Sequence, residues 1–140
     1  MDTLIIVRHA KAESAHLHTN DFDRPLTWQG ANDARDAARD ILSRHPEVSR
    51  ILASPARRTA TTAEIIAQAY GWDPKRIIMD ERIYEASLRT LTSIVAELGT
   101  VDGTVILVGH NPGVLELCYT LTGGRITSMS TSAVVEIPMQ

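Results

Sequence analysis

Two histidines that follow apolar segments are the side chains of this sequence best placed for chemistry. His9 comes just after the apolar segment 3–7, and His110 comes just after the segment 104–108. Both segments have the composition of buried β-strands, and in open α/β sheets the ligand crevice lies beyond the carboxyl ends of the strands. A neutral imidazole is a nucleophile near pH 7, because its reference pKa is about 6.5. These positions predict one site assembled from both halves of the chain.

An arginine pair follows a third apolar segment. Residues 50–53 are expected to form another strand, and Ser54-Pro55 is expected to open a helix with proline at its first position. An arginine in the first turns of this helix would reach the same crevice, where a guanidinium can bind phosphate through two hydrogen bonds. The alternative is a solvated arginine pair on the outer face of the helix, which suits Arg57 better than Arg58.

The residues around His110 favour the binding of an anion. Gly109 before it allows the backbone to come close to a ligand, and Asn111-Pro112 after it is expected to open a helix. The N-terminus of a helix attracts negative charge through its free N–H groups. The pattern therefore indicates an anion site at this end of the predicted sheet.

The elements that must position these residues alternate between strand and helix. Continuous apolar strands without polar alternation are typical of sheets that are buried on both faces. The alternation therefore predicts a three-layer α/β/α fold with a mainly parallel central sheet, although periodicity does not reveal the order of the strands. The strands are expected at 3–7, 50–53, 76–79, 105–108 and 133–137, and the helices at 28–45, 54–70, 88–98 and 112–121, with Thr27 as the first N-cap.

A polar stretch, residues 11–25, separates the first strand from the first helix. A loop this long in a compact domain is usually functional or mobile. It contains His16 and His18, which alternate in the manner of metal ligands, but no third ligand is evident and an ordinary polar loop is expected there. It also contains the cluster Asp21-Phe22-Asp23-Arg24.

Composition limits the classes of protein to consider. The chain has 140 residues, of which 44% are hydrophobic and 22% charged, so a single globular domain spanning 1–140 is expected. The net charge of -3 offers no basic surface for nucleic acid. The first apolar segment ends at Arg8 after a few residues, which predicts neither a signal peptide nor a membrane span.

The remaining singular side chains are expected to be structural. Cys118 is the only cysteine, so it can form no internal disulfide, and a reducing, cytoplasmic location is expected. The thiol itself is expected to be buried and inert. Trp28 and Trp72 are expected to be packing residues.

Taken together, the motifs resemble those of the histidine phosphatase superfamily, whose fold is called phosphoglycerate mutase-like. Arg8-His9-Ala10 matches its Arg-His-Gly signature, with alanine in place of glycine. The segment 54–63 meets the pattern Ser-Pro-x-x-Arg-x-x-x-Thr-Ala in full, which selects Arg58 over Arg57. Gly109-His110 matches the Gly-His motif before the last long helix.

Within this superfamily the chain is similar to the small SixA-like phosphohistidine phosphatases. The similarity rests on Ala10, on the stretch 23–27 with Gly30, and on the sequence Gly-His-Asn-Pro at 109–112. It spans nearly the whole chain.

The resemblance implies a phosphatase that carries the phosphoryl group on His9 as phosphohistidine and then releases it to water. Arg8, Arg58 and a protonated His110 would neutralise the phosphoryl oxygens, and Asn111 would be a further substrate contact. Preorganised charges of this kind dominate phosphoryl transfer. No metal or other cofactor is expected, because the arginines supply the charge.

The general acid is left open between two glutamates. Glu81 aligns best with the stretch that carries the acid in mutase-like relatives, and Glu85 is the rival. A third reading makes Glu81 a loop carboxylate that pairs with Arg82. A phosphoramidate P–N bond can be protonated on its own leaving nitrogen, whereas an alkyl phosphomonoester needs an acid from the enzyme.

The resemblance implies a phosphorylated protein or a small phosphorylated molecule as substrate. In 140 residues there is little room for a lid, which favours phosphohistidine on a protein surface. The alternatives are a small-molecule phosphomonoesterase or mutase of the same superfamily, and a catalytically silent module that binds phosphate.

Overall fold

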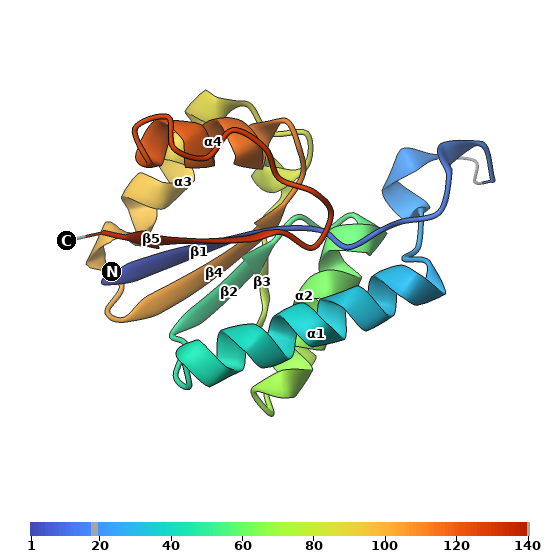
Figure 1. The fold of residues 1–140 in the computed structure, drawn as a ribbon, viewed down its shortest axis with the longest axis horizontal. Coiled ribbons are helices and arrows are strands. Elements are labelled where there is room, and N and C mark those ends of the chain that lie inside the picture. The colour runs from blue at the N-terminus through green and yellow to red at the C-terminus, as the bar shows by residue number, and fades with distance from the viewer. Residues whose placement is uncertain (18–19, 140) are drawn as a thin grey trace.

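A five-stranded sheet forms the middle of the molecule (Figure 1). The computed structural model describes residues 1–17 and 20–139. The strands lie in the order β3-β2-β4-β1-β5; β1 and β2 both pair in parallel with β4, β2 also pairs in parallel with β3, and β5 runs antiparallel to β1 at the edge. The prediction of a mainly parallel sheet is confirmed. The strands are β1 (Thr3–Arg8), β2 (Arg50–Ala53), β3 (Ile78–Met79), β4 (Thr104–Gly109) and β5 (Val134–Pro138).

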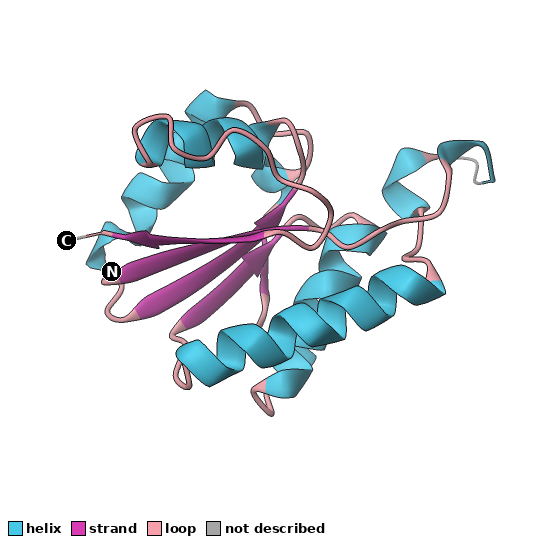
Figure 2. Ribbon diagram, viewed as in Figure 1, coloured by secondary structure: helices cyan, strands magenta, loops and turns pink. Residues whose placement is uncertain are grey.

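Helices cover both faces of the sheet, as Figure 2 shows. The pair α1 and α2 lies on one face, and the pair α3 and α4 lies on the other (Figure 1). The predicted three-layer α/β/α architecture is therefore present. The helices are α1 (Trp28–Arg44), α2 (Arg57–Ala69), α3 (Leu88–Glu97) and α4 (Gly113–Leu121).

The apolar sequence of β1 follows from burial on both faces. Side chains of a strand alternate between the two faces of its sheet. Leu4 and Ile6 pack into the core under α3 and α4, whereas Ile5 and Val7 pack into the core under α1 and α2. None of these four side chains is exposed to solvent, so every position between Thr3 and Arg8 has to be apolar.

Two predicted boundaries are wrong for local reasons. α2 begins at Arg57, so Pro55 precedes the helix instead of occupying its first position. Ser54 holds this turn, because its Oγ accepts from Ala56 N and its carbonyl accepts from Thr59 Oγ1. The strand expected at 76–79 contains only Ile78–Met79, because Pro74–Arg76 forms a 3₁₀ helix.

The tryptophan prediction holds for one residue and fails for the other. Trp72 packs against the core under α1 and α2, and the guanidinium of Arg76 lies 3.6 Å from the centre of its ring. Trp28 is 79% exposed at the start of α1 and packs little. Cys118 is fully buried in α4, as predicted, and burial raises the pKa of its thiol to about 12. Among the described residues, no helix combines the length and the apolar character that a membrane span requires.

The first turn of α1 is seated on the start of the polar stretch. Thr27 caps the helix as predicted, since its Oγ1 accepts from Gly30 N at 2.9 Å. Thr27 N also donates to the Lys11 carbonyl at 2.9 Å. A Cβ at Gly30 would lie 2.1 Å from that carbonyl oxygen, so the close approach requires glycine. This contact connects the residues after His9 to the helix that follows them.

We predict that Gly30→Ala destabilises the protein by about 1–3 kcal/mol, although Gly→Ala inside a helix ordinarily stabilises it by about 1 kcal/mol. The added methyl group would overlap a backbone carbonyl that cannot move aside freely. Urea unfolding measures the change. Gly99→Ala is the control, because its Cβ would meet nothing within 4 Å. A Gly30→Ala protein as stable as the control would show that α1 is not seated on Lys11.

Candidate active site

The register of three parallel strands brings three polar side chains to one edge of the sheet. His9, His110 and Ser54 follow β1, β4 and β2, which are neighbours in the sheet. His9 N donates to the Gly109 carbonyl, and Ser54 N donates to the Val108 carbonyl. The ring centres of His9 and His110 are consequently 5.5 Å apart.

His9 is held in one tautomer. Its Nδ1 lies 2.7 Å from the Ala10 carbonyl oxygen, which can only accept a hydrogen bond, so Nδ1 carries the proton and Nε2 keeps its lone pair. Burial, together with the positive charges of Arg58 and Arg8, lowers the pKa of His9 to about 4. The side chain is therefore a neutral imidazole at pH 7, with one nitrogen able to attack.

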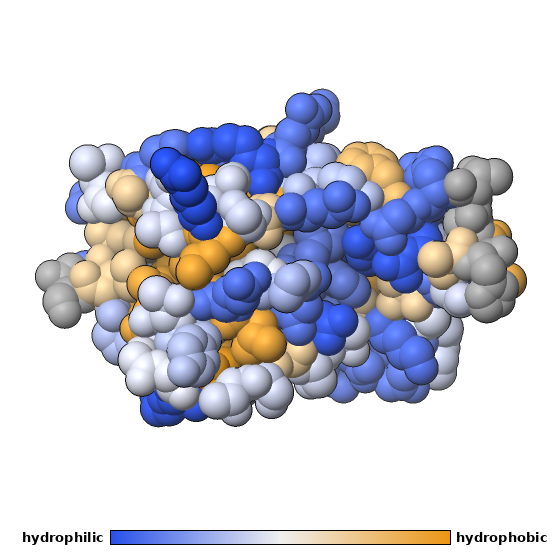
Figure 3. Space-filling model, turned by 90° about the horizontal axis from the view of Figure 1, so that it is seen from above, coloured by the Kyte–Doolittle hydropathy of each residue, from blue (hydrophilic) through white to orange (hydrophobic). Residues whose placement is uncertain are grey.

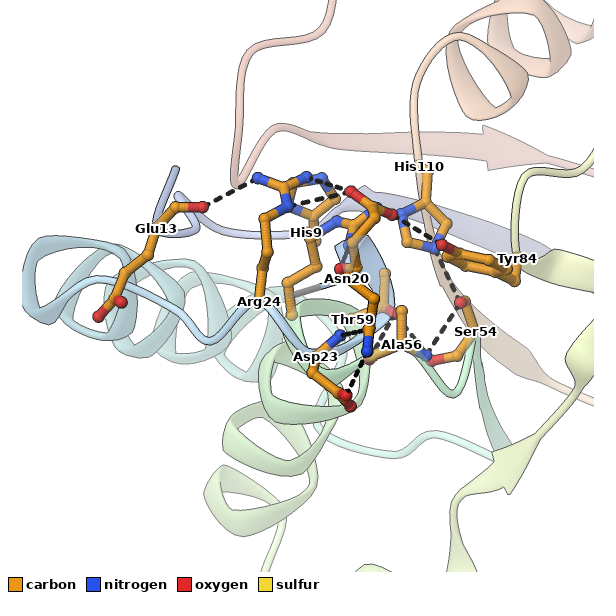
Figure 4. Close-up of polar contacts among 12 residues, drawn as sticks. His9, Glu13, Asn20, Asp23, Arg24, Ser54, Ala56, Thr59, Tyr84 and His110 are labelled. Carbon is orange, nitrogen blue, oxygen red and sulfur yellow. Dashed lines mark hydrogen bonds and ion pairs between the residues drawn. The ribbon is translucent and has the colours of Figure 1, made fainter. Parts of the chain in front are cut away.

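His110 is also neutral in the phosphate-free site. Its Nε2 lies 2.8 Å from Ser54 Oγ (Figure 4), and the Tyr84 ring packs edge-on against its ring at 5.5 Å. Burial and the charge of Arg58 lower its pKa to about 3. A His110 that is protonated when it faces a phosphoryl group remains a prediction, because the lowered pKa reflects an imidazole desolvated beside a cation alone.

Arg58 is the buried arginine of the pair, being 5% exposed, whereas Arg57 is exposed on the outer face of α2. Thr62, one turn further along the helix, donates from its Oγ1 to the Arg58 carbonyl at 2.7 Å. The same oxygen accepts from Ala10 N at 3.1 Å. The spacing Arg-x-x-x-Thr thus attaches the helix that carries Arg58 to the strand end that carries His9.

Asp21 lies in the site although sequence reasoning gave it no role. Its Oδ2 accepts from Arg58 Nη2 at 3.0 Å and from the Tyr84 hydroxyl at 2.7 Å, and its Oδ1 lies 2.8 Å from Arg24 Nη2. Burial alone would raise the pKa of Asp21, but the hydrogen bonds from Tyr84, Arg24 and Arg58 outweigh it and lower the pKa to about 2. The length of the polar stretch and its Asp-x-x-Arg cluster were the available signals.

Two residues expected to bind substrate, Arg8 and Asn111, donate hydrogen bonds to a backbone carbonyl of the chain. Arg8 donates from Nη1 to the Met129 carbonyl at 3.1 Å, and Asn111 donates from Nδ2 to the same oxygen at 3.0 Å. Arg8 Nε has no partner among the described residues and remains an available donor. Asn111 keeps only its buried carbonyl oxygen unpaired, and an acceptor does not attract phosphate.

A pocket of about 420 Å³ opens beside Arg58 and His110. Glu85 lines it, whereas Glu81 is exposed and lies outside its lining. The prediction that Glu81 forms an ion pair with Arg82 is wrong. Arg82 pairs instead with Asp80 and Glu97, each at 2.7 Å. The lining residues with polar side chains are Asp21, Arg58, Glu85, Ser87, His110, Asn111 and Glu116.

Gly109 serves packing and not a ligand. A Cβ there would lie 2.6 Å from Val114 Cγ1, so the glycine allows α4 to come close to the end of β4. The hypothesis that it clears space for an anion is therefore wrong. Of the two loop histidines, His18 lies outside the described residues. Across the part of the chain that the structure describes, no three His, Cys, Asp or Glu side chains are grouped to hold a metal ion.

Comparison with known proteins identifies the family. The sequence profile of the histidine phosphatase superfamily (branch 1) matches residues 4–101, and the chain belongs to that superfamily. An uncharacterized chloroplastic protein of Arabidopsis thaliana is 30% identical over 93% of this chain and 63% of its own length. A probable phosphoglycerate mutase, GpmB, of Escherichia coli is 32% identical over 71% of this chain and 52% of its own length. The chain thus spans between half and two thirds of these relatives.

Solved structures give closer matches in length. A "putative phosphohistidine phosphatase SixA" from Agrobacterium tumefaciens superposes with a TM-score of 0.88 at 28% identity, covering 99% of this chain and 92% of that one. A protein histidine phosphatase SixA complexed with tungstate superposes with a TM-score of 0.87 at 22% identity, covering 99% and 88%, which demonstrates the shared fold. The predicted membership of the superfamily and the predicted similarity of this chain to SixA are both confirmed.

We predict that both site histidines remain neutral at pH 6 in the phosphate-free protein, because burial and Arg58 lower their pKa values to about 4 and about 3. Protonation should begin only well below the reference pKa of about 6.5. Saturating phosphate should raise both pKa values, since its negative charge opposes that of Arg58. NMR titration of the imidazole nitrogens of His9 and His110 measures this. Ordinary titration of His9 near pH 6.5 without phosphate would contradict the electrostatic account.

Proposed function

We propose that this protein is a metal-independent phosphatase with His9 as its nucleophile, and that its substrate is phosphohistidine on another protein. The observation that carries the proposal is the state of His9: neutral, with Nδ1 bonded to the Ala10 carbonyl and Nε2 left unprotonated beside His110. An imidazole in this state can attack without a separate base.

The reaction proceeds in two displacements. The lone pair on His9 Nε2 attacks phosphorus, and the bond from phosphorus to the leaving nitrogen breaks. The leaving imidazole of the substrate takes up a proton from solvent, and the phosphoryl group stays on His9. Water then attacks phosphorus, releases inorganic phosphate and returns the electron pair to Nε2. No oxidation or reduction takes place, and the enzyme is regenerated.

Positive charge at the site would stabilise the transferring phosphoryl group. Arg58 presents two Nη atoms in the pocket, and a guanidinium matches two oxygens of a phosphoryl group. Arg8 lies close enough to His9 to depress its pKa and has Nε unpaired. In our proposal His110 gains a proton only as the phosphoryl group arrives, and then donates to one of its oxygens. Asn111 would bind substrate only if its amide left the Met129 carbonyl.

The position of the glutamates bears on the leaving group. Glu85 lines the pocket and is the better placed candidate for a general acid, whereas Glu81 remains a prediction that its place outside the pocket does not favour. Neither carboxylate is hydrogen-bonded within the cluster of His9, His110 and Arg58. A leaving group that is protonated from water, such as imidazole, suits this arrangement better than an alkoxide.

A protein substrate is supported by the surface next to the pocket. A second depression of about 350 Å³, lined by Leu88, Leu115 and Tyr119 among others, lies between α3 and α4 and shares Glu116 with the site pocket. In Figure 3 the apolar side chains of this face gather on one half, and hydrophilic side chains cover the other. The similarity to a phosphohistidine phosphatase supports the same substrate class. We infer a reducing, cytoplasmic location from the unpaired thiol of Cys118.

We predict that His9→Ala abolishes turnover while the protein remains folded, because it removes the nucleophile. The wild-type protein, quenched during turnover of phosphohistidine protein, should carry acid-labile, alkali-stable phosphate on His9. Mass spectrometry locates the label, and unfolding curves verify the fold. Label on another residue, or full activity of His9→Ala, would refute the mechanism. Transfer of the phosphoryl group to a small acceptor instead of water would indicate a mutase, and phosphate binding without turnover would indicate a silent module.

The two adjacent arginines provide a matched pair. We predict that Arg58→Ala lowers kcat/KM by roughly 10³-fold or more, the loss typical of an arginine that stabilises phosphoryl transfer. Arg57→Ala should change it by less than about threefold, because an exposed side chain on the outer helix face contributes little. Steady-state kinetics on one substrate compare the two. Equal losses of kcat/KM in the two variants would show that Arg58 does not face the phosphoryl group as we propose.

A further inference from the structure

The buried cation of the site, Arg58, is hydrogen-bonded to a carboxylate of the same chain. Arg58 donates from Nη1 to the Asp21 carbonyl at 2.9 Å and from Nη2 to Asp21 Oδ2 at 3.0 Å. The Tyr84 hydroxyl donates to the same Oδ2, and Arg24 donates from Nε to Oδ1 at 3.0 Å (dashed lines at Tyr84 and Arg24 in Figure 4). Two guanidiniums and one hydroxyl thus converge on one carboxylate.

These donors are also what a phosphoryl group would need. A guanidinium binds carboxylate and phosphate oxygens with the same fork of N–H groups, so a phosphoryl group that binds Nη1 and Nη2 of Arg58 must displace Asp21 from them. Only Nε of Arg58 has no partner among the described residues. Asp21 lines the same pocket as Arg58 and His110. The hydrogen bonds that lower its pKa to about 2 keep Asp21 ionised at pH 7.

We propose that Asp21 is a displaceable internal ligand of the phosphate site, and that a phosphoryl group binds by taking Arg58 and Tyr84 from it. The inference rests on the proposed function and adds a specificity determinant to it. An incoming anion must bind Arg58 more strongly than a carboxylate already held there. A phosphoryl group with two negative charges meets this requirement, whereas a monoanion such as acetate does not.

The geometry indicates which partner moves. The side chain of Arg58 is 6% exposed, and its backbone is held by Thr62. The side chain of Asp21 is 40% exposed and belongs to the 3₁₀ helix Asp21–Asp23, which buries none of its three residues. The carboxylate can therefore turn toward solvent while the guanidinium stays in place for the incoming anion, with Nη1 still bonded to the backbone carbonyl of Asp21.

Such competition would also speed the release of product. The apparent affinity of a site is its intrinsic affinity multiplied by the fraction of molecules that are open to ligand. Suppose that molecules in which Asp21 binds Arg58 outnumber those in which it does not by about ten to one. Inorganic phosphate then binds about tenfold more weakly than it would to an Arg58 free of Asp21. After hydrolysis the returning carboxylate would displace phosphate from Arg58.

The test is calorimetric binding of inorganic phosphate to the full chain. Asp21→Asn removes the charge without changing the shape, and we expect phosphate to bind about tenfold more tightly. Asp23→Asn is the matched control: it removes the same charge from the same helix, but Asp23 bonds Asn20 and not Arg58. A smaller change is expected there, and added salt should suppress it because the group is exposed. Equal tightening in both variants would reduce the effect to net charge and overturn the proposal.

Asp21→Ala allows a second measurement. With the carboxylate deleted, acetate should occupy its place and compete with phosphate, whereas acetate should not affect phosphate binding to the wild-type protein. Unchanged or weaker phosphate binding in Asp21→Asn would mean that Asp21 only positions Arg58. That result would overturn the proposal of a displaceable ligand and leave the proposed phosphatase function intact.

The Arg58→Ala variant shows whether phosphate binds through Arg58 at all. If it did so neither in the wild-type protein nor in Asp21→Asn, both the displaceable ligand and the proposed function would be wrong.

Discussion

The hydrogen-bonded register of β2, β4 and β1 is the constraint on which the site depends. Because Arg8 lies opposite Gly109 and Ala53 lies opposite Val108, the three strands end at the same level, and the residue after each end enters the same space. A slip of one residue would exchange the side chains that β1 packs into the two cores, and neither core would then fit them as it does in this register. Core burial therefore also holds the two histidines 5.5 Å apart.

Burial has a second effect, on charge. Removing Arg58 from water is costly unless an anion and hydrogen bonds compensate for the lost hydration. Asp21 supplies them in the phosphate-free state, and the histidines adapt by staying neutral. The buried charge of the site is thus kept nearly compensated within the chain itself. The same desolvation that leaves His9 unprotonated makes it available as a nucleophile.

Local patterns in the sequence were sufficient for most of the elements and for His9, His110 and Arg58. The apolar segments before His9 and His110 have no polar alternation, and only a sheet covered on both faces accounts for that. The spacing from Ser54 to Thr62 separated Arg58 from Arg57. Contacts between distant segments were not predictable in the same way: the strand order, the placement of β5 beside β1, and the meeting of Asp21 with Tyr84, which are 63 residues apart.

The errors have physical causes of the same kind. Gly109 resembled a glycine of a ligand-binding loop, but its missing side chain makes room for Val114. Glu81 and Arg82 are adjacent in the sequence, yet the turn directs Arg82 toward Glu97, fifteen residues further on.

The position of β1 has a consequence for biosynthesis. The first strand of the chain has no sheet partner until residues 104–109 exist, and its other edge waits for residues 134–138. The Met129 carbonyl, which accepts hydrogen bonds from Arg8 and Asn111, is also synthesised late. Contacts of such long sequence separation form slowly and only after the intervening chain has left the ribosome. A nascent chain therefore carries His9 long before the residues that surround this imidazole in the folded protein have been synthesised.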